Sequence, residues 1–130
     1  MLTHKMIAQA APSLGATIDF SGEWQNQLGS IMDLSMSGQS LSGRYKSPVS
    51  GDGTSVGGDL VGWVDGDLIS FTVNWTTPAS LTAWTGQLVD ESGRETIKTL
   101  WHLVKNIADA DEENGLWTST LTGTDSFWRI

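Results

Sequence analysis

The 130-residue chain carries 15 acidic against 7 basic side chains, which gives a formal net charge of −8 at pH 7. Nucleic acids and anionic membranes bind clustered Lys and Arg, so this balance argues against either partner. No apolar run approaches the roughly 18 residues that span a bilayer. The chain has no Cys, which excludes disulfides, thiol nucleophiles and thiolate metal sites. Its length is typical of a single domain with one core.

Tryptophan is over-represented among the aromatic residues, with 7 Trp against 3 Phe and 1 Tyr. An indole N–H needs a hydrogen-bond partner when it is buried, so a plain core uses Phe and Leu more often. The surplus indicates a ligand site or an interface, and a Trp-rich core is the alternative interpretation.

The N-terminal stretch MLTHKMIAQAAPSLGA has one Lys, small residues and only a broken apolar run. It lacks the pattern of a clear signal peptide. We expect residues 1–20 to form a leader or disordered segment, and residues 21–130 to form the folded domain.

The rest of the chain consists of short alternating segments separated by turn signals. The SGQS stretch (37–40) predicts a turn, residues 48–59 a Gly- and Ser-rich loop, DESGR (90–94) a hairpin loop, and residues 108–115 an acidic loop. Asp65 and Gly66 predict a type I′ hairpin turn. A helical turn fits only within residues 100–113. The predicted strands are 23–27, 30–36, 41–47, 60–64, 68–75, 80–89, 95–104 and 116–128.

Eight short strands with antiparallel connections predict an all-β fold, namely a closed eight-stranded up-and-down β-barrel. A closed barrel of this size has no exposed edge strands and has room for one small ligand. A β-sandwich is the alternative architecture.

The period of two in each predicted strand places large apolar side chains on one face and a small polar side chain on that same face near one end. Because successive strands alternate in direction, these polar groups are expected to gather at one rim. The sequence therefore predicts one closed apolar end and one polar cup. The inward set is Trp24, Asn26, Ser30, Met32, Leu34, Tyr45, Ser47, Phe71, Val73, Trp75, Ser80, Thr82, Trp84, Ile97, Thr99, Trp101, Leu103, Leu121, Asp125 and Phe127. Trp63 and Trp128 are predicted to pack or to lie on the surface.

Catalysis is not expected. His102 is out of phase with Trp101 and Leu103, so it points outward, and no Gly-x-Ser-x-Gly elbow is present. No two carboxylates share an interior face, as glycoside hydrolysis would require. The DADEENG stretch lacks the Gly and the closing Glu of a calcium loop, so we expect no metal site and no cofactor.

Five stretches, in order over residues 22–127, resemble the avidin/streptavidin family of biotin-binding proteins, in particular its bacterial-type members. They are GEWQNQLGS (22–30), LSGRYKSPV (41–49), SFTVNW with SLTAWTGQ (70–87), TLWHL (99–103) and LWTSTLTGTDSF (116–127). The resemblance implies a non-catalytic barrel that binds the vitamin biotin as a ligand and not as a covalent cofactor.

The resemblance also implies roles for single residues. Asn26, Ser30 and Tyr45 would donate hydrogen bonds to the ureido oxygen of biotin, while Ser47 and Asp125 would accept from its N–H groups. Ser80 and the backbone N–H groups near Ser50 and Gly51 would hold the carboxylate of the valerate tail. The remaining implied contacts are the ring walls Trp75, Trp84 and Trp101, Thr82 at the thioether, the apolar contacts Leu103 and Val49, and Trp117 from a neighbouring subunit.

The implied partners are biotin and further copies of the chain, in a homotetramer with a dimer as the alternative. Leu100, Thr122 and Thr124 stand at the positions that specify the tetramer in the family. The family also implies a secreted, extracellular or periplasmic location. Two other functions stay open: a barrel of the same shape that binds another small ligand in the lipocalin manner, and an assembly module whose Trp residues only pack.

Overall fold

The computed structural model describes residues 6–7, 9–11, 18–48, 56–75, 79–111, 115 and 120–130. Within these residues, the chain is almost entirely extended, as its alternating pattern predicts, and η1 (Asp109–Asp111) is a single 3-10 turn inside the segment where a helical turn is expected. The strands are β1 (Gly22–Asn26), β2 (Ile31–Ser37), β3 (Ser40–Ser47), β4 (Val56–Asp65), β5 (Leu68–Trp75), β6 (Ser80–Glu91), β7 (Arg94–Lys105) and β8 (Thr120–Arg129).

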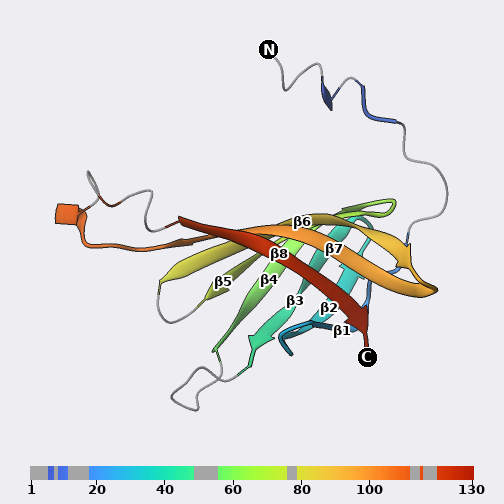
Figure 1. The fold of residues 1–130 in the computed structure, drawn as a ribbon, viewed down its shortest axis with the longest axis horizontal. Coiled ribbons are helices and arrows are strands. Elements are labelled where there is room, and N and C mark those ends of the chain that lie inside the picture. Colours follow the sequence, from blue (N-terminus) through green and yellow to red (C-terminus); the bar gives the residue numbers. More distant parts are fainter. Residues whose placement is uncertain are drawn as a thin grey trace.

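The strands form one closed antiparallel barrel in chain order, and the last strand returns to the first (Figure 1). Each strand pairs with the next, and β1 closes the ring on β8 through Trp24 opposite Arg129 and Asn26 opposite Phe127. The predicted barrel is therefore confirmed. The sandwich is wrong, because the seam between β1 and β8 is hydrogen-bonded and leaves no open sheet edge there.

The described strand ends agree with the predicted ones to within one or two residues, apart from the starts of β4 and β8. The predicted start of β8 at residue 116 lies outside the described residues, and the described strand begins at Thr120. The start of β4 differs for another reason. This strand begins at Val56, whereas residues 48–59 are predicted to form a loop. The Gly57 and Gly58 pair suggests a loop by composition, but both residues pair with β3. A Cβ at Gly58 would collide with the backbone carbonyl of Asn74, so the close approach of two strands requires glycine at this position.

The hairpin between β4 and β5 turns one residue later than predicted. Asp65 pairs with Leu68, so the two turn residues are Gly66 and Asp67. Gly66 has a φ of 59°, whereas Asp67 is not among the residues with positive φ. A type I′ turn needs positive φ at both central residues, so the predicted turn type is wrong.

Residues 90–94 are predicted to form a five-residue loop between β6 and β7. The observed turn is shorter, because Glu91 pairs directly with Arg94. The turn consists of Ser92 with φ 55° and Gly93 with φ 83°, the pattern of a type I′ turn. Asp90 accepts a hydrogen bond from the Gly93 N–H at 2.7 Å and fixes the turn.

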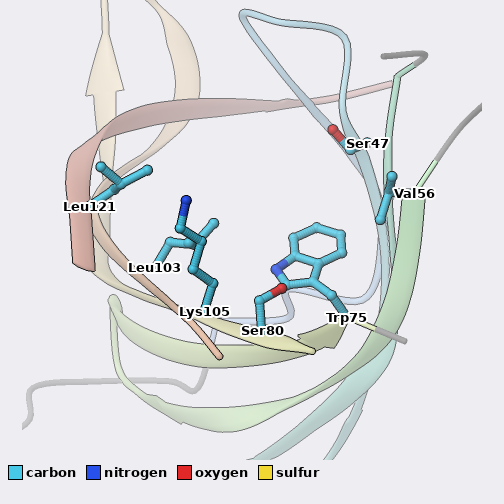
Figure 2. Close-up of a pocket in the computed structure, with 7 residues that line it drawn as sticks. All are labelled: Ser47, Val56, Trp75, Ser80, Leu103, Lys105 and Leu121. Carbon is cyan, nitrogen blue, oxygen red and sulfur yellow. The ribbon is translucent and has the colours of Figure 1, made fainter. Parts of the chain in front are cut away.

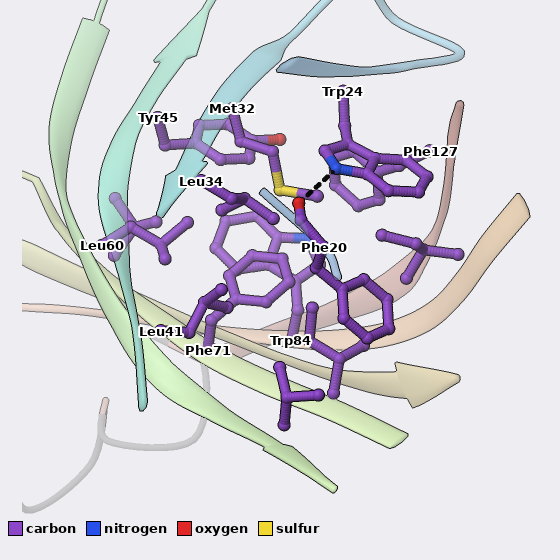
Figure 3. Close-up of a cluster of buried hydrophobic side chains, with 14 residues drawn as sticks. Phe20, Trp24, Met32, Leu34, Leu41, Tyr45, Leu60, Phe71, Trp84 and Phe127 are labelled. Atoms are coloured by element: carbon purple, nitrogen blue, oxygen red, sulfur yellow. Dashed lines mark hydrogen bonds between the residues drawn. The ribbon is translucent and has the colours of Figure 1, made fainter. Parts of the chain in front are cut away.

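The inward faces of the strands form one core that fills the closed end of the barrel (Figure 3). Phe20 belongs to this core with no exposed surface, although the predicted boundary places it in the leader. Its carbonyl accepts a hydrogen bond from the Trp24 indole at 2.9 Å, which holds the chain just before β1 against the barrel floor. The buried apolar set is Phe20, Trp24, Met32, Leu34, Leu41, Tyr45, Leu60, Val64, Ile69, Phe71, Val73, Trp84, Ile97 and Phe127.

The outer wall exposes several large apolar side chains, among them Val61 and Trp63 on β4 and Leu100 on β7. Trp63 lies on the surface, and Trp128 is half-buried beneath the guanidinium of Arg94, whose Cζ lies 4.7 Å from the ring centroid. None of the helical segments in the described residues has the length and apolar character of a bilayer span.

Candidate ligand-binding cup

Odd-numbered strands β1, β3, β5 and β7 all end at the same end of the barrel, because the strands alternate in direction. These ends carry Asn26, Ser47, Trp75 and Lys105. The backbone N–H of Asn26 donates to the Ser30 carbonyl at 3.0 Å across the first turn, which brings the start of β2 to this end. The predicted rim of polar groups is therefore formed.

Asn26, Ser30 and Tyr45 form a buried polar cluster, each at most 5% exposed. The Asn26 Oδ1 accepts from the backbone N–H of Ser30 at 2.8 Å and of Leu28 at 3.0 Å, so the amide nitrogen must point the other way. That nitrogen donates to the Tyr45 hydroxyl at 3.3 Å. The Ser30 side chain also hydrogen-bonds to Tyr45. Three potential donors thus converge on one region from three strand ends.

Asp125 on β8 supplies the buried carboxylate of the cup and is 7% exposed. Its Oδ2 accepts from the Trp84 indole N–H at 2.8 Å, and its Oδ1 accepts from the Gln27 Nε2 at 2.7 Å. The inward phase predicted for Asp125 is correct. A carboxylate offers about four lone-pair sites, so capacity remains for a further N–H donor.

Aromatic rings join the polar groups into one unit. Tyr45 stacks on Trp84 with 4.9 Å between ring centroids, and Trp84 stacks on Phe71 at 5.0 Å. Trp75 meets Tyr45 edge-on at 5.5 Å and donates its indole N–H to the Thr82 hydroxyl at 2.8 Å. These contacts limit rotamer freedom, so the polar groups are held in place by packing.

A cavity of about 360 Å³ opens at this end of the barrel, within the range of small-molecule sites (Figure 2). Larger hollows of about 460 and 610 Å³ lie on the outer wall, along outward-facing residues such as Trp63 and Leu100, and outside the cup. The buried polar cluster is connected to the cavity through Trp75, which lines the cavity and contacts Tyr45 and Thr82. The described lining residues are Ser47, Val56, Trp75, Ser80, Leu103, Lys105 and Leu121.

Trp101 lies directly over Gly123, its partner across β7 and β8. A Cβ at Gly123 would come within 2.6 Å of the Trp101 Cε2, so any side chain there must displace the indole. We expect Gly123→Ala to lower the free energy of unfolding by about 1–3 kcal/mol, the usual range for overpacking. Urea unfolding checks this, with Ser35→Ala on the exposed face of β2 as the control. Equal stability of the two variants would contradict the packing described here.

Burial raises the pKa of the Tyr45 phenol far above its ordinary value, and the nearby Asp125 charge adds to this rise, while the hydrogen bond from Ser30 opposes it. Above a pH of about 10 the unfolded chain therefore loses a proton that the folded chain keeps, and stability falls as pH rises. Tyr45 is the only Tyr, so phenolate absorbance reports this one residue. We expect no phenolate signal until the barrel unfolds. A titration near pH 10 with the barrel still folded would contradict this expectation.

Four predicted site residues, namely Val49, Ser50, Gly51 and Trp117, lie outside the described residues. The others face the interior or line the cavity. Sequence reasoning missed three contributors: Gln27, which holds Asp125, and Val56 and Lys105, which line the cavity. Lys105 could have been found by continuing the inward series Trp101, Leu103 by two more residues. Gln27 lies in a turn, where the strand period of two does not predict the direction of a side chain.

His102 is exposed on the outer face of β7, as predicted, so it forms no Ser–His–Asp arrangement in the cup. Over the part of the chain that the structure describes, no group of three or more His, Asp or Glu side chains is placed to hold a metal ion.

The fold and the cup define a closed β-barrel with a partly polar cup at one end, an architecture suited to one small ligand. A sequence model of the avidin family matches residues 15–130. Avidin-related protein 4/5 of Gallus gallus is 32% identical over 133 residues, covering 95% of this chain and 87% of that protein. Avidin of Gallus gallus is 29% identical over 135 residues, with the same coverage.

A crystal structure of xenavidin matches with a TM-score of 0.73 and 28% identity, covering 88% of this chain and all of that one. The chain belongs to the avidin family. The resemblance to bacterial-type members in particular stays a prediction.

Proposed function

We propose that the chain binds biotin in this cup, without catalysis and without a cofactor. The observation that carries the proposal is the buried cluster of Asn26, Ser30 and Tyr45 at the same end of the barrel as Asp125. A cyclic urea has one carbonyl oxygen and two N–H groups. The amide, the hydroxyl and the phenol can each present a donor to that oxygen, and the carboxylate can accept from an N–H.

The chemistry of this arrangement favours tight binding. Donors that converge on the carbonyl oxygen and an acceptor at the N–H polarise the ureido group in the same direction. Hydrogen bonds to a charged group such as Asp125 are about twice as strong as neutral ones. Because the cluster is buried, these bonds form in a medium of low dielectric. A site already held by packing also loses little entropy on binding.

The remaining assignments follow the barrel from its floor to its mouth. Trp84 and Trp101 would wall the bicyclic ring, with Thr82 at its sulfur. Ser47 would accept from the second ureido N–H. The aliphatic tail would pass Leu103, and Ser80 would hold its carboxylate. Trp75 would form a third wall of the ring, and its indole N–H already donates to the Thr82 hydroxyl at 2.8 Å.

As the family resemblance implies, the backbone N–H groups near Ser50 and Gly51 would also hold the carboxylate, Val49 would contact the tail, and Trp117 of a neighbouring copy would cover the cup. We propose a homotetramer, with a dimer as the alternative. The exposed Leu100, Val61 and Trp63, which are 60%, 63% and 67% exposed, support association through the outer wall. Thr122 and Thr124 also lie exposed on that wall. By family membership we propose a secreted, extracellular or periplasmic location.

Titration of the purified chain with biotin, followed by calorimetry and tryptophan fluorescence, tests the proposal. We expect saturation at one biotin per chain, and a solution mass of four chains. Absence of any response at micromolar biotin would contradict the binding function. A monomeric mass with full binding would contradict only the oligomer.

A further inference from the structure

Lys105 is the last residue of β7 and continues the inward phase of Trp101 and Leu103. It pairs with Ser80 across β6 and β7, and both residues line the cavity. Figure 2 shows the Lys105 side chain at the opening, with its nitrogen pointing into the space between the walls and on the same side as Leu103. A cation thus stands at the mouth of the cup, on the opening side of Leu103.

The chemistry of the lining changes along the cavity. Val56, Leu103 and Leu121 provide aliphatic surface, and Ser47 and Ser80 provide hydroxyls. Lys105 is the only charged residue among the described lining residues. The described ion pairs join Arg44 to Asp59, Lys98 to Glu91 and Arg129 to Glu95, and none of them involves Lys105. Its ammonium is therefore not engaged by a carboxylate of the described part of the chain.

The chain as a whole is acidic, with a formal net charge of −8. The negative field of the whole chain repels an anion, whereas the Lys105 ammonium attracts one locally at the rim. The charge of the ligand's end group is therefore expected to affect binding there. A Lys stem can lie along an apolar wall while its ammonium reaches water or an anion. A ligand with an aliphatic tail that ends in a carboxylate complements this cavity, because the tail can lie along the aliphatic lining and the carboxylate can reach Lys105.

We propose that Lys105 determines specificity for the ligand's end group, by binding the terminal carboxylate at the mouth of the cup. The cup then prefers the free acid to a neutral amide of the same ligand. This inference rests on the proposed biotin function and adds to it a residue outside the set that the family resemblance implies. Ser80, opposite Lys105 in the register, lines the same cavity.

Competition binding with biotin and biotin carboxamide tests the inference, because the two probes share the ring and differ in the charge of the end group. We expect the wild-type chain to prefer the acid by about fivefold, the upper end for an ion pair near solvent. Lys105→Met should remove this preference by weakening only acid binding, and Lys105→Arg should keep it. Added salt should reduce the preference in the wild type.

Lys98→Met is the matched control, since Lys98 lies on the outer face of the same strand and pairs with Glu91 at 2.5 Å. It removes the same charge away from the cup, so we expect the acid preference to persist. If Lys105→Met lowered the affinity for both probes equally, or left the preference for the acid unchanged, the inference would be overturned. Biotin binding itself would remain intact. Failure of the wild type to bind either probe would instead overturn the proposed function, and the inference with it.

Discussion

Asp125→Asn is expected to lower the affinity for biotin by about ten- to a hundredfold, the range of a hydrogen bond to a charged group. The Asp125 carboxylate already accepts from Trp84 at 2.8 Å and from Gln27 at 2.7 Å. An amide of the same shape has only one acceptor oxygen, so its NH₂ group must face one of these donors. The substitution therefore removes the charge that polarises the ureido group and also disturbs the groups that hold it.

The same variant is expected to lose about 1–3 kcal/mol of folding stability, because a buried donor is left without its acceptor. Asp33→Asn is the control, since Asp33 is exposed on the outer face of β2 and the charge change is identical. Competition binding and urea unfolding measure both effects. If Asp125→Asn bound biotin as the wild type does, the carboxylate would have no role in the site.

Trp24→Ala is expected to destabilise the barrel by about 3–5 kcal/mol, the usual cost of removing a buried Trp. Trp24 has no exposed surface, and its indole donates to the Phe20 carbonyl at 2.9 Å. The guanidinium of Arg129 lies over its ring, with Cζ 4.4 Å from the centroid. Arg129 also donates to the backbone carbonyls of Asp19 and Ser21. Trp24 thus supports the segment before β1 through Phe20, and the seam with β8 through Arg129.

Two further variants separate the loss of the indole hydrogen bond from the loss of the buried ring. Trp24→Phe keeps a ring but removes the donor, and we expect a loss of about 1–3 kcal/mol. Trp128→Ala removes a half-buried Trp that stacks under Arg94, and we expect a smaller loss than for Trp24→Ala. Urea unfolding of the three variants gives the order. A similar cost for Trp24→Ala and Trp128→Ala would contradict the role of Trp24 as the centre of the barrel floor.

Strand alternation predicts most of the fold and the inward faces. A strand that buries one face can shift by one residue only by exposing its whole apolar set, so the period of two fixes which residues face the cup. Asp125, Thr82 and Asn26 are buried for this reason, although each is polar. The same argument places His102 outside.

Contacts between distant segments could not be predicted in this way. Gly58 lies in a strand because it pairs with Tyr45 and Trp75, and it is a glycine because Asn74 of β5 lies too close for a Cβ. Both facts are set by the neighbouring strands and not by local composition. Phe20 precedes the first strand, and its burial depends on the floor that Trp24 and Arg129 complete. The hydrogen bond between Trp75 and Thr82 depends on a rotamer, which alternation does not determine.

A crystal structure of the chain with biotin tests the central claim most directly. We expect the ureido oxygen within hydrogen-bonding distance of Asn26, Ser30 and Tyr45, an N–H on Asp125, and the carboxylate at the mouth beside Lys105. Biotin bound with its ureido ring at the mouth, or on the outer wall near Trp63, would contradict the account.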